Sequence, residues 1–403
     1  RADTGLHDLV QRMKGSRTDL VIAAAFCGTI GLYDALYVIL MLSDGPVIGP
    51  ELKVLFPDFL VYWAAARAWL EGKLAIVYDI DAFTAYQNVL FADRFPNVVH
   101  FRPFFYPPIW LLMLVPFGLL GVAKAYGAFM TGTMALATAA EVRRDPWGWL
   151  VVLVSPAAVW VVLAGQNTFL SVALFYGGLQ LLPRASVPAG ILLGLLSYKP
   201  QIWVLVPLAL LAARQWRALA SMAATVLVLM LASAASFGPA FWLAFLDAAR
   251  EAAGPRVVEE MFERIFMHMT TLLAAARIVG LPPAVSGLVQ TAGALLAMAA
   301  VWLSFSRKGQ SDARIAVLAT ATFLVSPYTL NYDLLLLMPA AVAMFRLGIA
   351  DGFRPMERLV LLMLWLIPTL GMILNRLDLP LMPLVILAFG WFAWQRLGAL
   401  KPA

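Results

Sequence analysis

Charge is scarce in this sequence: 13% of its 403 residues are Asp, Glu, Lys or Arg, whereas 62% are hydrophobic. Soluble domains usually carry about 25% charged residues, and no water-soluble fold of this length could bury so much apolar surface. The shortage of charge therefore excludes a soluble globule and a disordered chain. It favours an all-α polytopic membrane protein, whose apolar stretches approach the roughly 20 residues that cross a bilayer.

Residues that bind metals or form disulfides are also few. The single cysteine, Cys27, lies inside an apolar stretch, which excludes a disulfide framework and a thiolate metal site. The three histidines, His7, His100 and His268, leave little room for a histidine metal cluster. The sequence also lacks a phosphate loop, a dinucleotide fingerprint and a nucleophile elbow. We therefore expect no bound metal and no cofactor.

The apolar stretches predict about twelve membrane spans within a single domain that covers 1–403. The basic segment 1–18 is predicted to be cytoplasmic by the positive-inside rule. A net charge of +6 fits cytoplasmic Lys and Arg flanks and is no sign of a nucleic-acid partner. The predicted spans are 20–42, 106–120, 123–140, 147–164, 168–182, 187–213, 218–236, 283–305, 315–327, 330–345, 359–373 and 379–394.

One pair of basic residues conflicts with this count. Twelve full spans place Arg143 and Arg144 outside, against the positive-inside rule. A half-dipping segment at 106–120, or a helix broken at Pro200, resolves the conflict. The side of the membrane on which Gln166 lies depends on that choice.

Two polar loops are predicted on the outer side, at 43–105 and 237–281. The first is long, aromatic and mixed in charge. Within it, the spacing of Phe59, Tyr62, Trp63, Ala66 and Leu70 predicts an amphipathic helix over 59–70. Such a helix lies in the outer interface rather than across the membrane.

Polar residues that flank or interrupt apolar spans are the candidate functional residues, because burying them in a membrane is costly. Asp58 precedes the aromatic helix, and its residue type and position alone favour a helix N-cap. Lys199 lies between two apolar runs and needs a partner or water, while Pro200 frees backbone groups beside it. Arg102 is either an interfacial anchor or a functional cation. The other candidates are Gln166 and Asn167, Gln201, His268, Tyr328, Asn331, Tyr332 and Asp333.

Two further acidic features are weaker candidates. The Asp79-Ile80-Asp81 spacing imitates the metal-binding pair of nucleotide-sugar transferases, yet a three-residue pattern in an acid-rich loop is weak evidence. Asp34, inside the first predicted span, is the second-choice functional carboxylate.

Several short motifs, in their order and spacing from Asp58 to Asp333, resemble the bacterial polyprenyl-phosphate-mannose-dependent mannosyltransferases. These enzymes form glycosyltransferase family 87 of the C-type glycosyltransferase superfamily. The motifs that carry the resemblance are Asp58-Phe59 with Tyr62, Ala65-Ala66, Gly72, Tyr78-Asp79, Tyr106-Pro107-Pro108, Gly165-Gln166-Asn167, Gly190 and Gly194 before Lys199-Pro200, Ser326-Pro327, and Tyr332-Asp333.

This resemblance implies a C-type fold, in which a long first outer loop with interfacial helices carries the catalytic carboxylate. Carried onto this chain, the carboxylate is Asp58, and the resemblance favours catalysis over capping. It also implies an inverting hexosyltransferase that moves a sugar, mannose as first expectation, from polyprenyl phosphate to a lipid or glycan. The enzyme would lie in the bacterial inner membrane with its site facing outward, among membrane lipids. The residues expected to bind the substrates are Lys199, Arg102, His268, Tyr62, Trp63, Tyr106, Gln166, Asn167, Gln201, Tyr328, Asn331, Tyr332 and Asp333.

Two other classes stay open. A secondary transporter or flippase also uses broken helices and buried polar groups, although no internal repeat is visible. An O-antigen ligase or polymerase is also multi-spanning, but such enzymes usually carry their large loop late in the chain, whereas here the early loop is longer.

Overall fold

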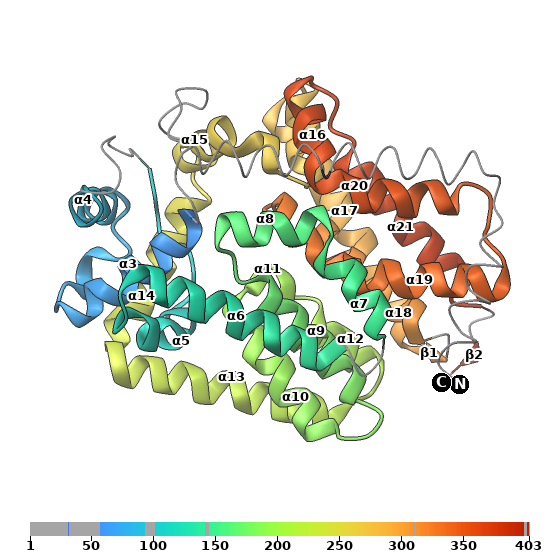
Figure 1. Ribbon diagram of the computed structural model, residues 1–403, viewed down its shortest axis with the longest axis horizontal. Coiled ribbons are helices and arrows are strands. Elements are labelled where there is room, and N and C mark those ends of the chain that lie inside the picture. The colour runs from blue at the N-terminus through green and yellow to red at the C-terminus, as the bar shows by residue number, and fades with distance from the viewer. Residues whose placement is uncertain are drawn as a thin grey trace. The chain divides into compact units, whose positions relative to one another are not determined.

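The computed structural model describes residues 57–92, 101–141, 145–308 and 311–398, with residues 31, 401 and 402 (Figure 1). The first predicted span, the N-terminal segment 1–18 and the alternative carboxylate Asp34 lie outside the described residues, as do Arg143 and Arg144. The chain divides into two compact units. One unit draws on 145–160 and on the chain from Met267 onward, and the other on 38–144 and 161–266. We call them the C-terminal unit and the N-terminal unit.

Helices occupy the described part of the first outer loop. These are α3 (Pro57–Leu70), η2 (Leu74–Ile76) and α4 (Ile80–Leu90). The predicted helix at 59–70 is confirmed, but its buried residues run along consecutive positions from Phe59 to Tyr62 and from Ala64 to Ala66. Most of its circumference is therefore packed against protein, unlike an amphipathic helix that lies on a surface with one face exposed.

The next two helices form a sharp bend. α5 (Pro108–Gly118) begins at a proline, which is favoured at the first helical position. It meets α6 (Val122–Glu141) at 119° across a short break. A helix of 11 residues spans about 17 Å, which is shorter than the hydrocarbon core. α5 therefore has a length and geometry that fit a half-dipping segment at 106–120, which was one of the two alternatives from sequence.

Two short helices follow and lead into α9. They are α7 (Pro146–Leu153) and α8 (Pro156–Ala164), bent by 56° at their junction. α8 ends at Gly165, whose φ of +73° belongs to the left-handed region where glycine is favoured. The chain then enters α9 (Thr168–Leu181). Gln166 and Asn167 thus form the tight turn between two apolar helices.

The predicted span at 187–213 is broken near its middle. It consists of α10 (Ser186–Leu195), η3 (Leu196–Tyr198), α11 (Pro200–Trp203) and α12 (Val206–Ala212). The long helix α13 (Trp216–Phe237) follows and lies beside α10 (Figure 1). A Cβ atom at Gly190 would lie 1.9 Å from Ser221 Oγ, and one at Gly194 would lie 2.7 Å from Thr225 Cβ. The Gly190-x-x-x-Gly194 spacing therefore lets the two helices approach closely.

The second outer loop is also helical. It contains α14 (Pro239–Ala252), α15 (Pro255–Ile265), η4 (Phe266–His268) and α16 (Leu272–Ile278). α14 packs Phe241 and Phe245 against Tyr78, with ring centroids 4.5 and 5.7 Å apart. This contact joins the described parts of the two predicted outer loops within the N-terminal unit.

The C-terminal unit holds the remaining helices. They are α17 (Pro283–Phe305), α18 (Ser311–Val325), η5 (Asn331–Leu337), α19 (Met338–Asp351), α20 (Glu357–Arg376) and α21 (Met382–Gln395). A two-residue antiparallel pairing joins β1 (Arg307–Lys308) to β2 (Lys401–Pro402). Ion pairs join elements of this unit: Asp145 beside α7 pairs with Arg346 of α19, and Glu357 of α20 pairs with Arg396 after α21.

The chain is a multi-pass membrane protein with an all-helical architecture. Four described helical segments are long and apolar enough to cross a membrane, and the bent pairs α5–α6 and α7–α8 raise the number to six. The four are Trp216–Phe237, Pro283–Phe305, Asn331–Asp351 and Glu357–Arg376. Twelve full-length spans are more than the described residues supply, because several predicted spans, such as α9 and α21 with 14 residues each, are short apolar helices.

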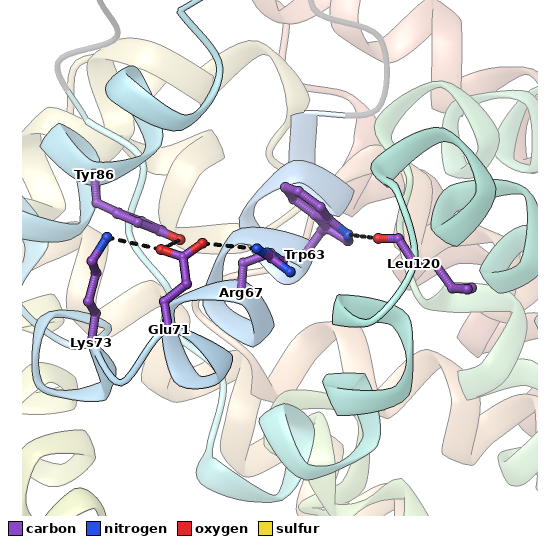
Figure 2. A network of polar contacts seen from close by, with 6 residues as sticks. All are labelled: Trp63, Arg67, Glu71, Lys73, Tyr86 and Leu120. Atoms are coloured by element: carbon purple, nitrogen blue, oxygen red, sulfur yellow. Dashed lines mark hydrogen bonds and ion pairs between the residues drawn. The ribbon is translucent and has the colours of Figure 1, made fainter.

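A network of polar contacts joins the C-terminal half of α3 to neighbouring elements (Figure 2). Glu71 accepts hydrogen bonds from Arg67 at 3.1 Å, Lys73 at 2.9 Å and Tyr86 at 3.2 Å. Trp63 donates its indole N–H to the Leu120 carbonyl, between α5 and α6, at 2.9 Å. Hydrogen bonds from Lys73, Tyr86 and Arg67 lower the pKa of the Glu71 carboxyl. Burial, and secondarily the negative charge of Glu71, raises the pKa of the Tyr86 phenol. The network fixes α3 against α4 and the α5–α6 bend.

Candidate active site

The Asp58 carboxylate lies at the start of α3 and reaches across to Gln166. Pro57 is the first residue of the helix, so Asp58 belongs to its first turn and is not its N-cap. Its Oδ2 atom accepts a hydrogen bond from Gln166 Nε2 at 2.7 Å, across 108 residues of sequence. A carboxylate is stabilised in its charged form by a helix N-terminus and by a directed donor. Asp58 therefore makes a long-range tertiary contact in addition to its favourable position in the helix.

The Gln166 side chain uses both of its polar ends. Its Oε1 atom accepts from the Tyr62 hydroxyl at 2.8 Å and from the Asn167 backbone N–H at 3.2 Å. The Tyr106 hydroxyl lies 3.3 Å from the same oxygen and 2.8 Å from the Tyr62 hydroxyl. Because the oxygen faces these donors, the amide nitrogen must face Asp58.

The network continues to Lys199 through Asn167. Asn167 Nδ2 donates to the Tyr62 oxygen at 3.3 Å, and its Oδ1 accepts from Lys199 Nζ at 3.0 Å. Lys199 is only 1% exposed, and it stands where η3 ends and Pro200 starts α11. Its backbone (φ −121°, ψ 78°) lies outside the α region, which is disfavoured before proline. A buried lysine costs free energy unless a polar partner contacts it, and Asn167 is such a partner.

Burial and neighbouring charge keep Tyr62 protonated. Its pKa is raised chiefly by burial, and further by Tyr106 and the negative charge of Asp58. The Tyr62 ring packs edge-on against Tyr106 and Trp110, with centroids 5.2 and 5.4 Å away. Tyr62 therefore acts as a neutral hydrogen-bond donor held by aromatic neighbours.

Two residues of this network were not among the sequence candidates. Tyr198 donates to the Asn167 carbonyl at 3.2 Å, and its oxygen lies 2.8 Å from Ser171 Oγ. Trp110 stacks on the Tyr198 ring at a centroid distance of 4.5 Å. Tyr198 directly precedes Lys199, which is the one sequence signal that could have indicated it. Ser171 gives no such signal, because a serine in an apolar helix is common.

Arg102 is positioned by α4. Its backbone N–H donates to Thr84 Oγ1 at 3.0 Å, and its carbonyl accepts from Gln87 Nε2 at 2.7 Å. Burial lowers the pKa of the guanidinium, and the negative charge of Asp58 partly offsets this. Arg102 is thus a cation whose charge interacts with that of Asp58.

Two other candidates of the N-terminal unit are Trp63 and Gln201. Trp63 directs its polar atom to Leu120, as described above, and Gln201 is half-buried on α11.

His268 and Asn331 pair within the C-terminal unit. Asn331 donates its amide to the Pro368 carbonyl at 3.0 Å, so its Oδ1 atom faces His268 Nδ1 at 3.2 Å and that nitrogen is the donor. Burial, and secondarily the charge of Arg376, lower the pKa of His268 to about 4. The ring is therefore neutral at pH 7. At this pH His268 can form hydrogen bonds but does not supply a positive charge.

The other three candidates of this unit have structural contacts. Asp333 Oδ2 accepts the backbone N–H of Leu330 at 3.2 Å, which is a capping contact at the start of η5. The backbone of Tyr328 is held by Ser326, whose Oγ atom lies 2.8 Å from the Tyr328 carbonyl and 3.1 Å from its N–H. Tyr332 is buried.

The Asp79 and Asp81 side chains do not converge on one point. Asp79 caps α4 by accepting the Ala82 N–H at 2.9 Å. Asp81 has 77% of its side chain exposed and lies 3.7 Å from Arg256. Among the described residues, no three His, Cys, Asp or Glu side chains are grouped as metal ligands.

A sequence model of glycosyltransferase family 87 matches residues 104–327. The chain belongs to this family. The matched region covers more than half of the chain and includes Tyr106, the Gln166-Asn167 turn, Lys199 and His268, whereas Asp58 precedes it. No curated protein and no solved structure gives a significant match.

Membership of glycosyltransferase family 87 makes the chain a membrane-embedded glycosyltransferase that uses a sugar donor and an acceptor. Such an enzyme needs a group that takes the acceptor proton and groups that receive the charge of the leaving group. The N-terminal unit places a carboxylate, a cation that interacts with it and a buried lysine on one set of connected elements. That set has the chemical groups that glycosyl transfer requires.

Proposed function

We propose that this protein is an inverting hexosyltransferase that uses a polyprenyl-phosphate sugar as donor, mannose being the first candidate. The acceptor is a lipid or glycan at the outer face of the bacterial inner membrane. The observation that carries the proposal is the Asp58 carboxylate, held at 2.7 Å by Gln166 in a network that also contains Lys199.

In the proposed reaction, Asp58 removes the proton of the acceptor hydroxyl as its oxygen attacks the anomeric carbon. The bond between that carbon and the phosphate oxygen breaks, and polyprenyl phosphate leaves with the bonding electrons. Attack from the face opposite the phosphate inverts the anomeric configuration. General-base assistance of this kind contributes on the order of 100-fold or more.

Positive charge offsets the phosphate charge in this proposal. Lys199 and Arg102 carry that charge in the N-terminal unit, and both are removed from bulk water, where electrostatic stabilisation is stronger. Tyr62, Tyr106 and Trp63 offer aromatic faces for a sugar, and Asn167 and Gln201 are the further proposed substrate contacts of this unit.

The outward-facing site is supported by the ion pair of Asp145. Asp145 follows the basic pair Arg143-Arg144 and contacts Arg346 of α19, which leads toward Arg354 and Arg358. Basic clusters favour the cytoplasmic side, so the start of α7 belongs at that side. In this proposal the chain crosses the membrane through α7 and α8 and reaches Gln166 at the outer side.

The test uses purified protein in nanodiscs with labelled polyprenyl-phosphate mannose, polyprenyl-phosphate glucose or a nucleotide sugar, and a membrane-lipid extract as acceptor. We expect transfer from a polyprenyl-phosphate sugar and from no nucleotide sugar, with inversion at the anomeric carbon by NMR. Direct use of the nucleotide sugar without a lipid carrier would overturn the proposal.

The matched variants are Asp58→Asn and Asp81→Asn, since both carboxylates belong to the first outer loop. Asn keeps the shape of Asp but cannot take a proton, so Asp58→Asn should lose activity about 100-fold or more and still bind donor. The exposed Asp81→Asn should remain active. An Asp58→Asn variant with half of the wild-type rate would remove Asp58 from the mechanism.

A further inference from the structure

Asp58 is one end of a hydrogen-bonded chain whose donors all point the same way. Lys199 donates to Asn167, Asn167 donates to Tyr62, Tyr62 donates to Gln166, and Gln166 donates to Asp58. The chain therefore begins at a buried cation and ends at the carboxylate. All of its members belong to the N-terminal unit.

The direction of each amide in this chain is fixed by its neighbours. Lys199 can only donate, so the oxygen of Asn167 faces it and the nitrogen faces Tyr62. The phenol of Tyr62 is protonated, and the Asn167 backbone N–H also donates to Gln166 Oε1. Reversing the Gln166 amide would place its NH₂ against these donors and its oxygen against the Asp58 carboxylate. The hydrogen bonds to Tyr62, Asp58 and the Asn167 backbone would then all be lost.

We infer that Gln166 is the positioning residue of the base: its locked amide orients the Asp58 carboxylate toward the acceptor and keeps it ionised. The inference rests on the proposed function, since it requires Asp58 to be the base. It gives Gln166 a role in orienting Asp58 in place of the substrate contact that the resemblance implied. Tyr62, Tyr106 and Asn167 hold the amide, and Lys199 anchors the far end.

The electrostatics of Asp58 support a measurable consequence. Arg102 and Tyr62 interact electrostatically with Asp58, the Tyr62 hydroxyl also hydrogen-bonds to Tyr106, and Lys199 is linked to Asp58 through the hydrogen-bonded chain. A hydrogen-bond donor to a carboxylate favours its charged form and lowers its pKa. Removing the Gln166 donor should therefore raise the pKa of the base, and the acid limb of the activity profile should move to higher pH.

The experiment compares Gln166→Met and Gln166→Glu with Gln180→Met. Gln180 donates to Glu141 Oε1 at 2.7 Å, so it is a matched amide–carboxylate pair away from Asp58. We expect Gln166→Met to lower kcat about 10-fold, with donor KM changed by less than about threefold, and to raise the acid limb by about one pH unit. Gln166→Glu should raise that limb further, because two carboxylates then face each other. Gln180→Met should leave the limb in place.

A Gln166→Met variant that raises only donor KM, with an unchanged acid limb, would show that Gln166 binds the donor, and the inference would be overturned. If both Gln166 variants fail to fold, Tyr106→Phe replaces them, because it removes one phenol near Gln166 Oε1 and should shift the limb in the same direction by a smaller amount. An unshifted limb in a folded, active Tyr106→Phe variant would overturn the inference. A wild-type protein without transfer, or an active Asp58→Asn variant, would instead reject the proposed function.

Discussion

Lys199 Nζ donates to Asn167 Oδ1 at 3.0 Å, and this contact joins a broken helix to the α8–α9 turn. The two residues are 32 positions apart, and both are fully or almost fully buried. The lysine lies where Pro200 interrupts the apolar run, and the asparagine ends a turn that Gly165 makes possible. Two local interruptions of helical structure therefore meet in one polar contact.

Lys199 variants should change donor use. Lys199→Ala removes a buried charge and leaves the Asn167 oxygen unpaired, which costs about 1–3 kcal/mol of stability. Its donor kcat/KM should fall at least about 10-fold, with a smaller effect on acceptor KM, since the proposed partner is the donor phosphate. Lys199→Arg should rescue poorly because the planar guanidinium does not replace a compact ammonium in a closed site.

Steady-state titration of donor at fixed acceptor, and the converse, separates these effects. Lys124→Ala, an exposed lysine of α6, is the control and should behave as wild type. A Lys199→Ala variant that alters only acceptor KM would assign Lys199 to the acceptor.

His268 should make the protein less stable in mild acid. Its folded pKa is about 4, below the unfolded value of about 6.5, so between these values the unfolded chain binds more protons. Stability from this group is fully present above pH 6.5 and is lost as the pH falls toward 4. Thermal unfolding in detergent at pH 7.5 and pH 5.5 should therefore show a smaller decrease in Tm for His268→Asn than for wild type. An equal decrease in both would mean that His268 is not buried as a neutral ring.

The glycines of α10 should tolerate no side chain. A Cβ at Gly190 would clash with Ser221 Oγ and with the Ala218 carbonyl at 2.2 Å, and backbone cannot move aside as a side chain can. We expect Gly190→Ala to destabilise by about 1–3 kcal/mol, as overpacking does, and to lower Tm by several degrees. Gly132→Ala on α6, where nothing lies within 4 Å of the new Cβ, is the control and should be neutral or stabilising.

Transfer should need no divalent cation. Asp79 is occupied as a helix cap and Asp81 is exposed beside Arg256, and fixed cations are available for a single donor phosphate. Activity with excess chelator should match activity without it. Complete loss on chelation, restored by magnesium or manganese, would return Asp79 and Asp81 to consideration as ligands.

Periodicity and hydropathy located the apolar helices well, because a long apolar run in a membrane must satisfy its own backbone hydrogen bonds and therefore forms a helix. The predicted 283–305 coincides with α17, and 123–140 lies within α6. A half-dipping segment at 106–120 was one of two alternatives from sequence, but the 119° bend after α5 could not be predicted, since it depends on how α5 packs against α3 and α6. Of the roughly twelve predicted spans, four to six are long enough to cross a membrane among the described residues, because hydropathy locates apolar segments but not the breaks that shorten their helices.

The residues of the candidate site could also be predicted from sequence, whereas their contacts could not. Lys199, Gln166 and Asn167 stood out in sequence because polar residues within apolar runs are costly. Their connection to Asp58 could not be predicted, because hydrogen bonds across 104 to 108 residues depend on tertiary packing. The charge state of His268 also depends on burial and on Arg376, which sequence spacing does not reveal.

The order in which the two units draw on the chain has a consequence for biosynthesis. The N-terminal unit is complete once residue 266 has been synthesised, whereas the C-terminal unit needs the last third of the chain. Because domains fold as units while the ribosome is still translating, the Asp58–Gln166–Lys199 chain can form before α17 has emerged. In a nascent chain halted once Phe266 has left the ribosome, these residues should therefore already be protected from solvent exchange. Residues 145–160 should not yet be protected, because the rest of their unit follows Phe266 in the chain.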